Sequence, residues 1–199
     1  MPKPWWREVL ETVVYALVLA ILLRTFIIQA FWIPSGSMIP TLEPGDRVLV
    51  LKFWYKFPII EYSNNGETSS KFSKLHVSMM KPKRGQVVVF KYPIDTKRDF
   101  VKRLIGLPGD TIEIDNEARV FVNGEVLDEF YTINEKKEPF GPVVVPAHHY
   151  FFLGDNRSNS QDSRFWASNG NMMHFVPEGY LKGPVIFRYW PLRRMGRVR

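Results

Sequence analysis

The chain has 199 residues, of which 45% are hydrophobic and 24% charged, and its formal net charge is +7. This length allows one domain with a proper core and leaves residues for a membrane anchor. Because the chain contains no cysteine, disulfides, thiolate nucleophiles and cysteine-ligated zinc are excluded. The basic residues are scattered among strand-like segments, which disfavours nucleic-acid binding and agrees with attraction to anionic lipid headgroups.

The first segment of the chain predicts a membrane helix. Its unbroken run of eleven apolar residues, Val13–Leu23, is too short alone for the roughly 20 residues that a membrane span needs. Tryptophans precede this run, and further aromatic residues follow Arg24, as is typical of the two membrane interfaces. We therefore expect a span from Trp5 to about Thr25.

A cleaved signal peptide would also have a charged start and a short apolar core. Gln29 and Phe31 put bulk where a small-x-small cleavage site would be needed, which favours a retained anchor. Lys3 and Arg7 orient the N-terminus towards the cytoplasm. We expect residues 1–30 to be a single-pass anchor in the cell membrane, followed by an extracytoplasmic catalytic domain at 31–199.

The remainder of the chain predicts short antiparallel strands and no long amphipathic helix. Apolar or alternating runs are separated by turn residues, and Asn123-Gly124 is a strong hairpin signal. The expected strands are Gly45–Leu51, Gln86–Pro93, Asp99–Gly106, Thr111–Asp115, Arg119–Val122, Tyr150–Leu153 and Val185–Phe187. Residues Lys56 to Lys83 have little pattern and indicate a surface excursion. The fold class is thus mostly β, a sandwich or a partly closed barrel of antiparallel strands.

A serine lies in a proline-punctuated stretch just after the anchor. Pro34 and Pro40 fix their own φ angles and disfavour helix before them, so we expect a rigid loop or strand that presents Ser37. Gly36 permits close approach of another backbone segment. The pattern suits a nucleophile with its oxyanion donors, although a flexible linker after an anchor would look similar.

A serine nucleophile needs a base, and the usual base is histidine. The histidines here stand in polar or loop contexts that indicate surface positions; they are His76, His148, His149 and His174. A neutral lysine can replace histidine, and Lys102 would have a lowered pKa if it faced the apolar side of its strand. Like-charge repulsion from nearby Arg103 or Arg164 would lower that pKa further. A lysine in a strand more often lies on the solvated face. Since Lys102 and Arg103 point to opposite faces, one of them must approach the core.

A dense polar stretch, Gly154–Arg164, directly follows the apolar strand Tyr150–Leu153. It contains two aspartates and two arginines at regular spacing, as an ordered hydrogen-bonded support for a site would.

Together these segments make the chain resemble the type I signal peptidases, membrane-anchored bacterial serine proteases with a Ser/Lys dyad. The resemblance extends from the anchor to Pro191. Its four ordered blocks are Pro34–Leu42, Gly45–Val48, Lys102–Asp110 and Gly154–Arg164.

The resemblance implies the roles of individual residues. Ser37 would be the nucleophile, Lys102 the general base, and Ser35 a side-chain oxyanion donor beside the Ser37 backbone N–H. Ser160 would hydrogen-bond the lysine amine. Two further residues would support the site structurally, Asp162 and Arg164.

The same resemblance implies removal of signal peptides from exported preproteins at the outer face of the cytoplasmic membrane. It also implies a functional link to the export machinery, and no metal or organic cofactor. The chain departs from the family pattern at Gln86, often acidic in the family, and at Ala167–His174, usually a single glycine.

A function of another class is a non-catalytic, membrane-tethered β module that binds lipid or an envelope protein through its basic face. It accounts for the anchor, the charge and the strands. It leaves the spacing of Ser37, Lys102 and Ser160 to coincidence.

Overall fold

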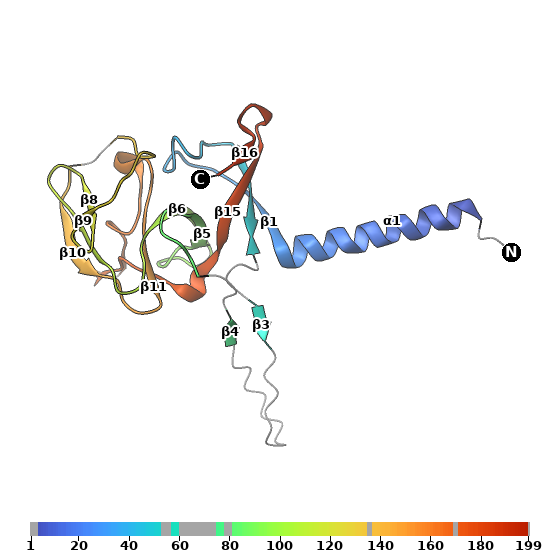
Figure 1. The fold of residues 1–199 in the computed structure, drawn as a ribbon, viewed down its shortest axis with the longest axis horizontal. Helices are drawn as coiled ribbons and strands as arrows, with labels where there is room; N and C mark the ends of the chain where they lie inside the picture. The colour runs from blue at the N-terminus through green and yellow to red at the C-terminus, as the bar shows by residue number, and fades with distance from the viewer. Residues whose placement is uncertain are drawn as a thin grey trace, which may run out of the picture.

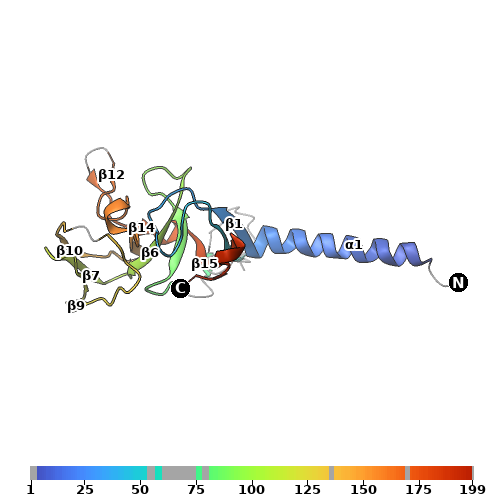
Figure 2. The ribbon, with the colours of Figure 1, turned by 90° about the horizontal axis from the view of Figure 1, so that it is seen from above.

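The structure, a computed structural model, describes residues 4–52, 57–59, 75–77, 81–134, 137–168 and 171–198. Its helix α1 (Trp5–Leu22) continues into a π-helical turn, η1 (Leu23–Ile27), and extends away from a β domain (Figures 1 and 2). Pro4 precedes the helix and Glu8 lies in its first turn, both favourable at a helix N-terminus. The helix lies where the sequence predicts one.

Within the part of the chain that the structure describes, no helix combines the length and the apolarity needed to cross a membrane. The segment from Trp5 to about Thr25 is therefore helical, but it does not meet the requirements for the membrane span expected there. Helix α1 has 18 residues, three of them charged, whereas a span needs roughly 20 predominantly apolar residues.

Most of the other secondary-structure elements are strands. They are β1 (Ile28–Trp32), β2 (Arg47–Leu51), β3 (Phe57–Ile59), β4 (Leu75–Val77), β5 (Val87–Lys91), β6 (Asp99–Gly106), β7 (Thr111–Ile114), β8 (Val120–Val122), β9 (Glu125–Val126), β10 (Phe140–Val144), β11 (His149–Leu153), β12 (Ala167–Ser168), β13 (Asn171–Met172), β14 (Val176–Pro177), β15 (Leu181–Trp190) and β16 (Gly196–Arg197). Short 3-10 helices are η3 (Arg157–Asn159), η4 (Glu178–Tyr180) and η5 (Leu192–Arg194).

One antiparallel sheet holds eight of these strands, in the order β1-β2-β15-β5-β6-β11-β14, with β16 beside β15. A second sheet has the order β10-β7-β8-β9, and two hairpins pair β3 with β4 and β12 with β13. The large sheet is open, because its edge strands β1 and β14 are not paired with each other. The predicted mostly β, antiparallel fold is confirmed.

Alternation along β5 divides the core between the two faces of the large sheet. Val88 and Phe90 pack in a cluster with Trp166, whereas Val87 belongs to a second cluster that includes Met38 from the Ser37 loop. A third cluster joins β6 and β11 to the second sheet. The loop that carries Ser37 is therefore attached to the core.

Several strands were not among those expected from the sequence, including β10 and β14, and two further differences concern β15 and β1. β15 is longer than the expected Val185–Phe187, because a register shift accommodates Gly183 and Pro184 while pairing continues. β1 pairs with β2 over its whole length and extends across the boundary expected between residues 30 and 31. A surface excursion was expected at Lys56–Lys83. The structure describes only β3, β4 and residues 81–83 of this range, and the other residues lie outside the described part of the chain.

Candidate active site

Ser37 lies in the loop between β1 and β2, and its neighbours anchor that loop. Met38 and Leu42 are fully buried, and the Leu42 N–H donates to the Met38 carbonyl oxygen at 2.8 Å. The Ser37 residue itself is only 7% exposed. Its hydroxyl thus projects from a backbone segment that the core holds in place.

Lys102 is brought to Ser37 by strand β6, where it pairs with Val88 of β5. Its Nζ lies 2.6 Å from Ser37 Oγ, and the residue is 4% exposed. Burial lowers the pKa of Lys102 to about 8, since the charged ammonium loses hydration, while the carboxylates of Asp162 and Asp155 act in the opposite direction. A buried amine with this pKa beside a hydroxyl can act as a general base.

The electrostatic surroundings of Lys102 differ from the sequence expectation. We expected Arg103 or Arg164 to lower its pKa further by like-charge repulsion. Instead, each arginine forms an ion pair with an aspartate, Arg103 with Asp155 and Arg164 with Asp162. The two carboxylates raise the pKa of Lys102, so desolvation alone accounts for its net lowering.

The segment after β11 packs against the Ser37 loop. The Asn156 backbone N–H donates to the Ser37 carbonyl oxygen at 3.1 Å, and its side-chain amide donates to the Gly36 carbonyl oxygen at 3.1 Å. A Cβ atom on Gly154 would lie 2.6 Å from the Ser37 carbonyl oxygen. Only glycine allows the two segments to come this close.

Ser160 is buried in the same place, but its predicted hydrogen bond is not formed. Its Oγ has no hydrogen-bond partner among the residues that the structure describes. The hydroxyl lies against Gly154, at a point that a Gly154 Cβ would approach to 2.1 Å. The structure therefore places Ser160 beside the Ser37 loop without a bond to Lys102.

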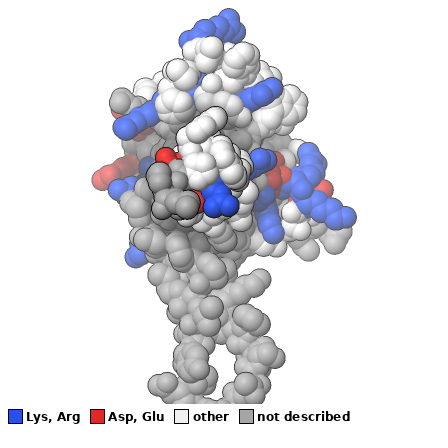
Figure 3. All heavy atoms as spheres, turned by 90° about the vertical axis from the view of Figure 1, so that its right-hand side faces the viewer, with Lys and Arg blue, Asp and Glu red and all other residues white. Residues whose placement is uncertain are grey.

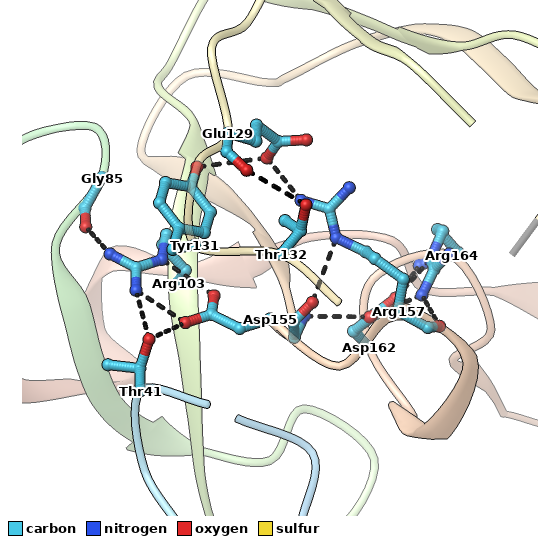
Figure 4. A network of polar contacts seen from close by, with 11 residues as sticks. Thr41, Gly85, Arg103, Glu129, Tyr131, Thr132, Asp155, Arg157, Asp162 and Arg164 are labelled. Carbon is cyan, nitrogen blue, oxygen red and sulfur yellow. Dashed lines mark hydrogen bonds and ion pairs between the residues drawn. The ribbon is translucent and has the colours of Figure 1, made fainter. Parts of the chain in front are cut away.

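Asp162 and Arg164 hold the Gly154–Arg164 loop together (Figure 4). Arg164 Nε donates to Asp162 Oδ1 at 2.8 Å, and Arg164 Nη2 donates to the Arg157 carbonyl oxygen at 2.9 Å. Asp162 Oδ2 accepts the Gly154 N–H at 3.0 Å. These buried contacts fix the segment that packs against Ser37.

A second ionic network was not foreseen from the sequence. Arg103, next to Lys102 in β6, binds both carboxylate oxygens of Asp155 through Nε at 2.8 Å and Nη2 at 2.6 Å. Thr41 Oγ1 donates to the same carboxylate at 2.5 Å, and Tyr131 lies with its ring centre 3.8 Å from the Arg103 guanidinium carbon (Figure 4). Lys102 and Arg103 are both buried, so each of them, rather than one, approaches the interior.

This network continues to a buried ion pair between Arg157 and Glu129. Arg157 also donates from Nε to the Gly154 carbonyl oxygen at 3.1 Å. Asp155 and Arg157 lie within the polar stretch Gly154–Arg164 that was singled out from the sequence. Glu129 and Tyr131 lie in irregular chain, where no periodic pattern marks them.

A groove of about 530 Å³ opens beside Ser37 and Lys102. Ser35, the expected oxyanion donor, is exposed and lines this groove. β11 pairs with β6 only from Arg103 to Gly106, so the Asp99–Lys102 part of β6 borders the groove. Its lining residues are Pro34, Ser35, Gly36, Ser37, Arg98, Asp99, Phe100, Val101, Lys102, Asn159 and Gln161.

The described histidines have partners other than Ser37. His148 contacts Glu178, His149 contacts the Ala147 carbonyl oxygen, and His174 contacts the Ser163 carbonyl oxygen at 2.7 Å. The side chain of the fourth histidine, His76, lies outside the described residues.

Comparisons with known proteins identify the family of this chain. Residues 6–190 match the family model described as signal peptidase, peptidase S26. A probable signal peptidase I-2 of a Synechocystis species is 38% identical, covering 98% of this chain and 78% of that protein. A signal peptidase I of Pseudomonas aeruginosa is 33% identical, covering 92% and 72%.

A solved signal peptidase I from Enterococcus faecalis is 31% identical, covering 54% of this chain and 99% of that chain, with a TM-score of 0.44. The match to the family model and the two relatives cover most of the sequence. The chain therefore belongs to the signal peptidase family, peptidase S26, whose members are serine endopeptidases.

Proposed function

We propose that this chain removes signal peptides from exported preproteins by acyl transfer, with Ser37 as nucleophile and Lys102 as general base. The observation that carries the proposal is the 2.6 Å separation between Ser37 Oγ and a buried Lys102 amine whose pKa is lowered to about 8. The hydroxyl of a serine is a weak nucleophile until an adjacent base accepts its proton. A lysine can do so only when it is neutral.

The reaction then follows from these two groups. Neutral Lys102 accepts the hydroxyl proton while Ser37 Oγ bonds to the scissile carbonyl carbon, and the Ser35 hydroxyl and Ser37 N–H stabilise the oxyanion. The C–N bond breaks as the lysine ammonium returns the proton to the leaving amine. Lys102 next deprotonates a water molecule, which hydrolyses the acyl-enzyme and releases Ser37.

We expect the substrate to bind along the edge of β6 opposite β5, where no described strand pairs with Asp99–Lys102. An extended peptide beside Asp99–Lys102 would gain main-chain hydrogen bonds, as added strands do. Alternate side chains of such a peptide point into the wall of the groove. We expect this arrangement to select small residues at the first and third positions before the cut.

Ser160, Asp162 and Arg164 are proposed as positioning residues. The Asp162–Arg164 pair fixes the loop that packs on Ser37, which supports a structural role for both. The Ser160 hydroxyl has no partner among the described residues, and it is available to orient the lysine amine during catalysis.

The chain is proposed to be held in the cell membrane by α1 together with η1, which continues it, with the N-terminus cytoplasmic and the β domain outside. All described α1 side chains are exposed, and its apolar ones would be covered by lipid. Figure 3, which views the side from which α1 extends, shows Lys and Arg around the helix. These cations would attract anionic headgroups.

Membrane attachment is tested by washing membranes that contain the full chain. We expect it to stay in the pellet in alkaline buffer and in high salt, because apolar burial holds it. Leu17→Glu, on the exposed helix, should weaken retention, whereas the control Glu11→Gln should not. Release of the unaltered protein by salt would show peripheral attachment instead.

Cleavage is tested with a peptide that carries alanine at the first and third positions before the bond. Wild type should cleave it, and Ser37→Ala should lose nearly all turnover while its thermal unfolding is unchanged. The non-catalytic β module predicts no cleavage by either protein. Cleavage by folded Ser37→Ala at the wild-type rate would rule out the proposed nucleophile.

A further inference from the structure

Arg98 borders the groove but has no part in the proposed chemistry. It lies in the turn between β5 and β6, where its N–H donates to the Asp95 carbonyl oxygen at 3.0 Å. Its own carbonyl oxygen accepts the Tyr92 N–H at 2.9 Å. Two backbone hydrogen bonds therefore fix Arg98 at the start of β6, on the wall that Ser37 and Lys102 share.

The side chain of Arg98 is also held in place. Tyr92 and Phe100 stack with their ring centres 4.2 Å apart and their planes 4° apart. The Arg98 guanidinium carbon lies 5.7 Å from the Tyr92 ring centre and 5.5 Å from that of Phe100. Cation–π attraction orients the guanidinium but leaves its N–H donors for another partner.

The charge of Arg98 is not compensated by the neighbouring carboxylate. Asp99 also lines the groove, but its carboxylate accepts a hydrogen bond from Lys182 Nζ at 2.6 Å. Among the residues that the structure describes, no ion pair joins Arg98 to a carboxylate. The groove therefore presents a fixed positive group near the start of β6.

We infer that Arg98 is a specificity-determining residue that favours peptides with a carboxylate side chain a short distance from the cut bond. Arg98 precedes Lys102 by four positions, about 13 Å along an extended strand. A peptide lying beside β6 would place there its fourth residue before the cut bond or, in the opposite direction, its third or fourth residue after it. The inference rests on the proposed function, since it assumes that peptides bind this groove.

The size of the effect follows from the exposure of Arg98. Ion pairs at exposed positions change affinity by about two- to fivefold, and salt screens them. We therefore expect Glu at the favoured position to bind about two- to fivefold more tightly than Gln, and Lys to bind more weakly. The differences should shrink at about 1 M salt.

The test measures peptide binding to full-length Ser37→Ala in detergent, by fluorescence anisotropy. The peptides keep alanine at the first and third positions before the scissile bond and carry Glu, Gln or Lys at the fourth position before it or at the third or fourth position after it. The same measurements are made with two double variants, in which Ser37→Ala is combined with Arg98→Glu or with the control substitution Lys97→Glu. Lys97 is the exposed neighbouring cation, and it does not line the groove. Cleavage of the Gln peptides by the wild-type protein is measured in parallel.

A preference for Glu that Arg98→Glu reverses and Lys97→Glu retains is the expected result. Equal Kd values for the three peptides at every position, or a preference that survives Arg98→Glu, would overturn the inference. Cleavage of the Gln peptides by wild type would leave the proposed function standing in that case. Peptides that are neither bound nor cleaved would overturn both.

Discussion

Gly154→Ala should both destabilise the protein and displace Ser37, the proposed nucleophile. A Cβ atom at this position would lie 2.1 Å from Ser160 Oγ, 2.5 Å from Ser160 Cβ and 2.6 Å from the Ser37 carbonyl oxygen. The last of these belongs to backbone that Asn156 holds by a hydrogen bond, so it cannot move freely. Overpacking of this kind costs about 1–3 kcal/mol of unfolding free energy.

The cost should appear in two measurements. For a chain of this length, each kcal/mol lowers Tm by about 2–4 °C, so a fall of about 2–12 °C is expected. Displacing Ser37 by about 1 Å would lower kcat/KM by about 10²-fold, because proton transfer and attack require the existing geometry. Thermal unfolding and peptide cleavage by the purified variant provide both values.

Gly179→Ala is the matched control, since a Cβ there meets nothing within 4 Å. It should leave both Tm and kcat/KM near their wild-type values. The reasoning would be refuted if Gly154→Ala were as stable and as active as Gly179→Ala, because the two segments would then not be packed as closely as the structure shows.

Asp155→Asn should lower the unfolding free energy by about 3–5 kcal/mol, measured by denaturant titration, because it leaves the buried Arg103 guanidinium without its anionic partner. An unchanged midpoint would mean that Arg103 finds compensation elsewhere. Ser35→Ala should reduce kcat by about 10²–10³-fold with no change in Tm, since it removes one proposed oxyanion donor from an exposed position. Full activity in this variant would exclude Ser35 from the oxyanion hole.

Sequence patterns predicted the strands best where local chemistry determines them. The β-branched run in β5 and the alternation in β6 mark strands whichever neighbours they acquire, and Asn123-Gly124 marks the hairpin between β8 and β9. Ser37 and Lys102 could be paired because each stands in a distinctive block, although 65 residues separate them.

The remaining features depend on contacts that no local pattern records. β15 continues through Gly183 and Pro184 because neighbouring strands pair around the register shift. Arg103 can be buried only because Asp155 and Tyr131 come from distant segments. The carboxylates of Asp155 and Asp162, which pair with Arg103 and Arg164, raise the pKa of Lys102, so the expected repulsion from these arginines was wrong.

The pH dependence of kcat/KM on a soluble peptide tests most directly the claim that neutral Lys102 activates Ser37. With a pKa of about 8, the neutral fraction rises about tenfold between pH 7 and pH 9, and kcat/KM should rise with it. Lys102→Arg should be inactive throughout, because a guanidinium stays protonated. A profile that is flat over this range, or activity that persists in Lys102→Arg, would contradict the claim.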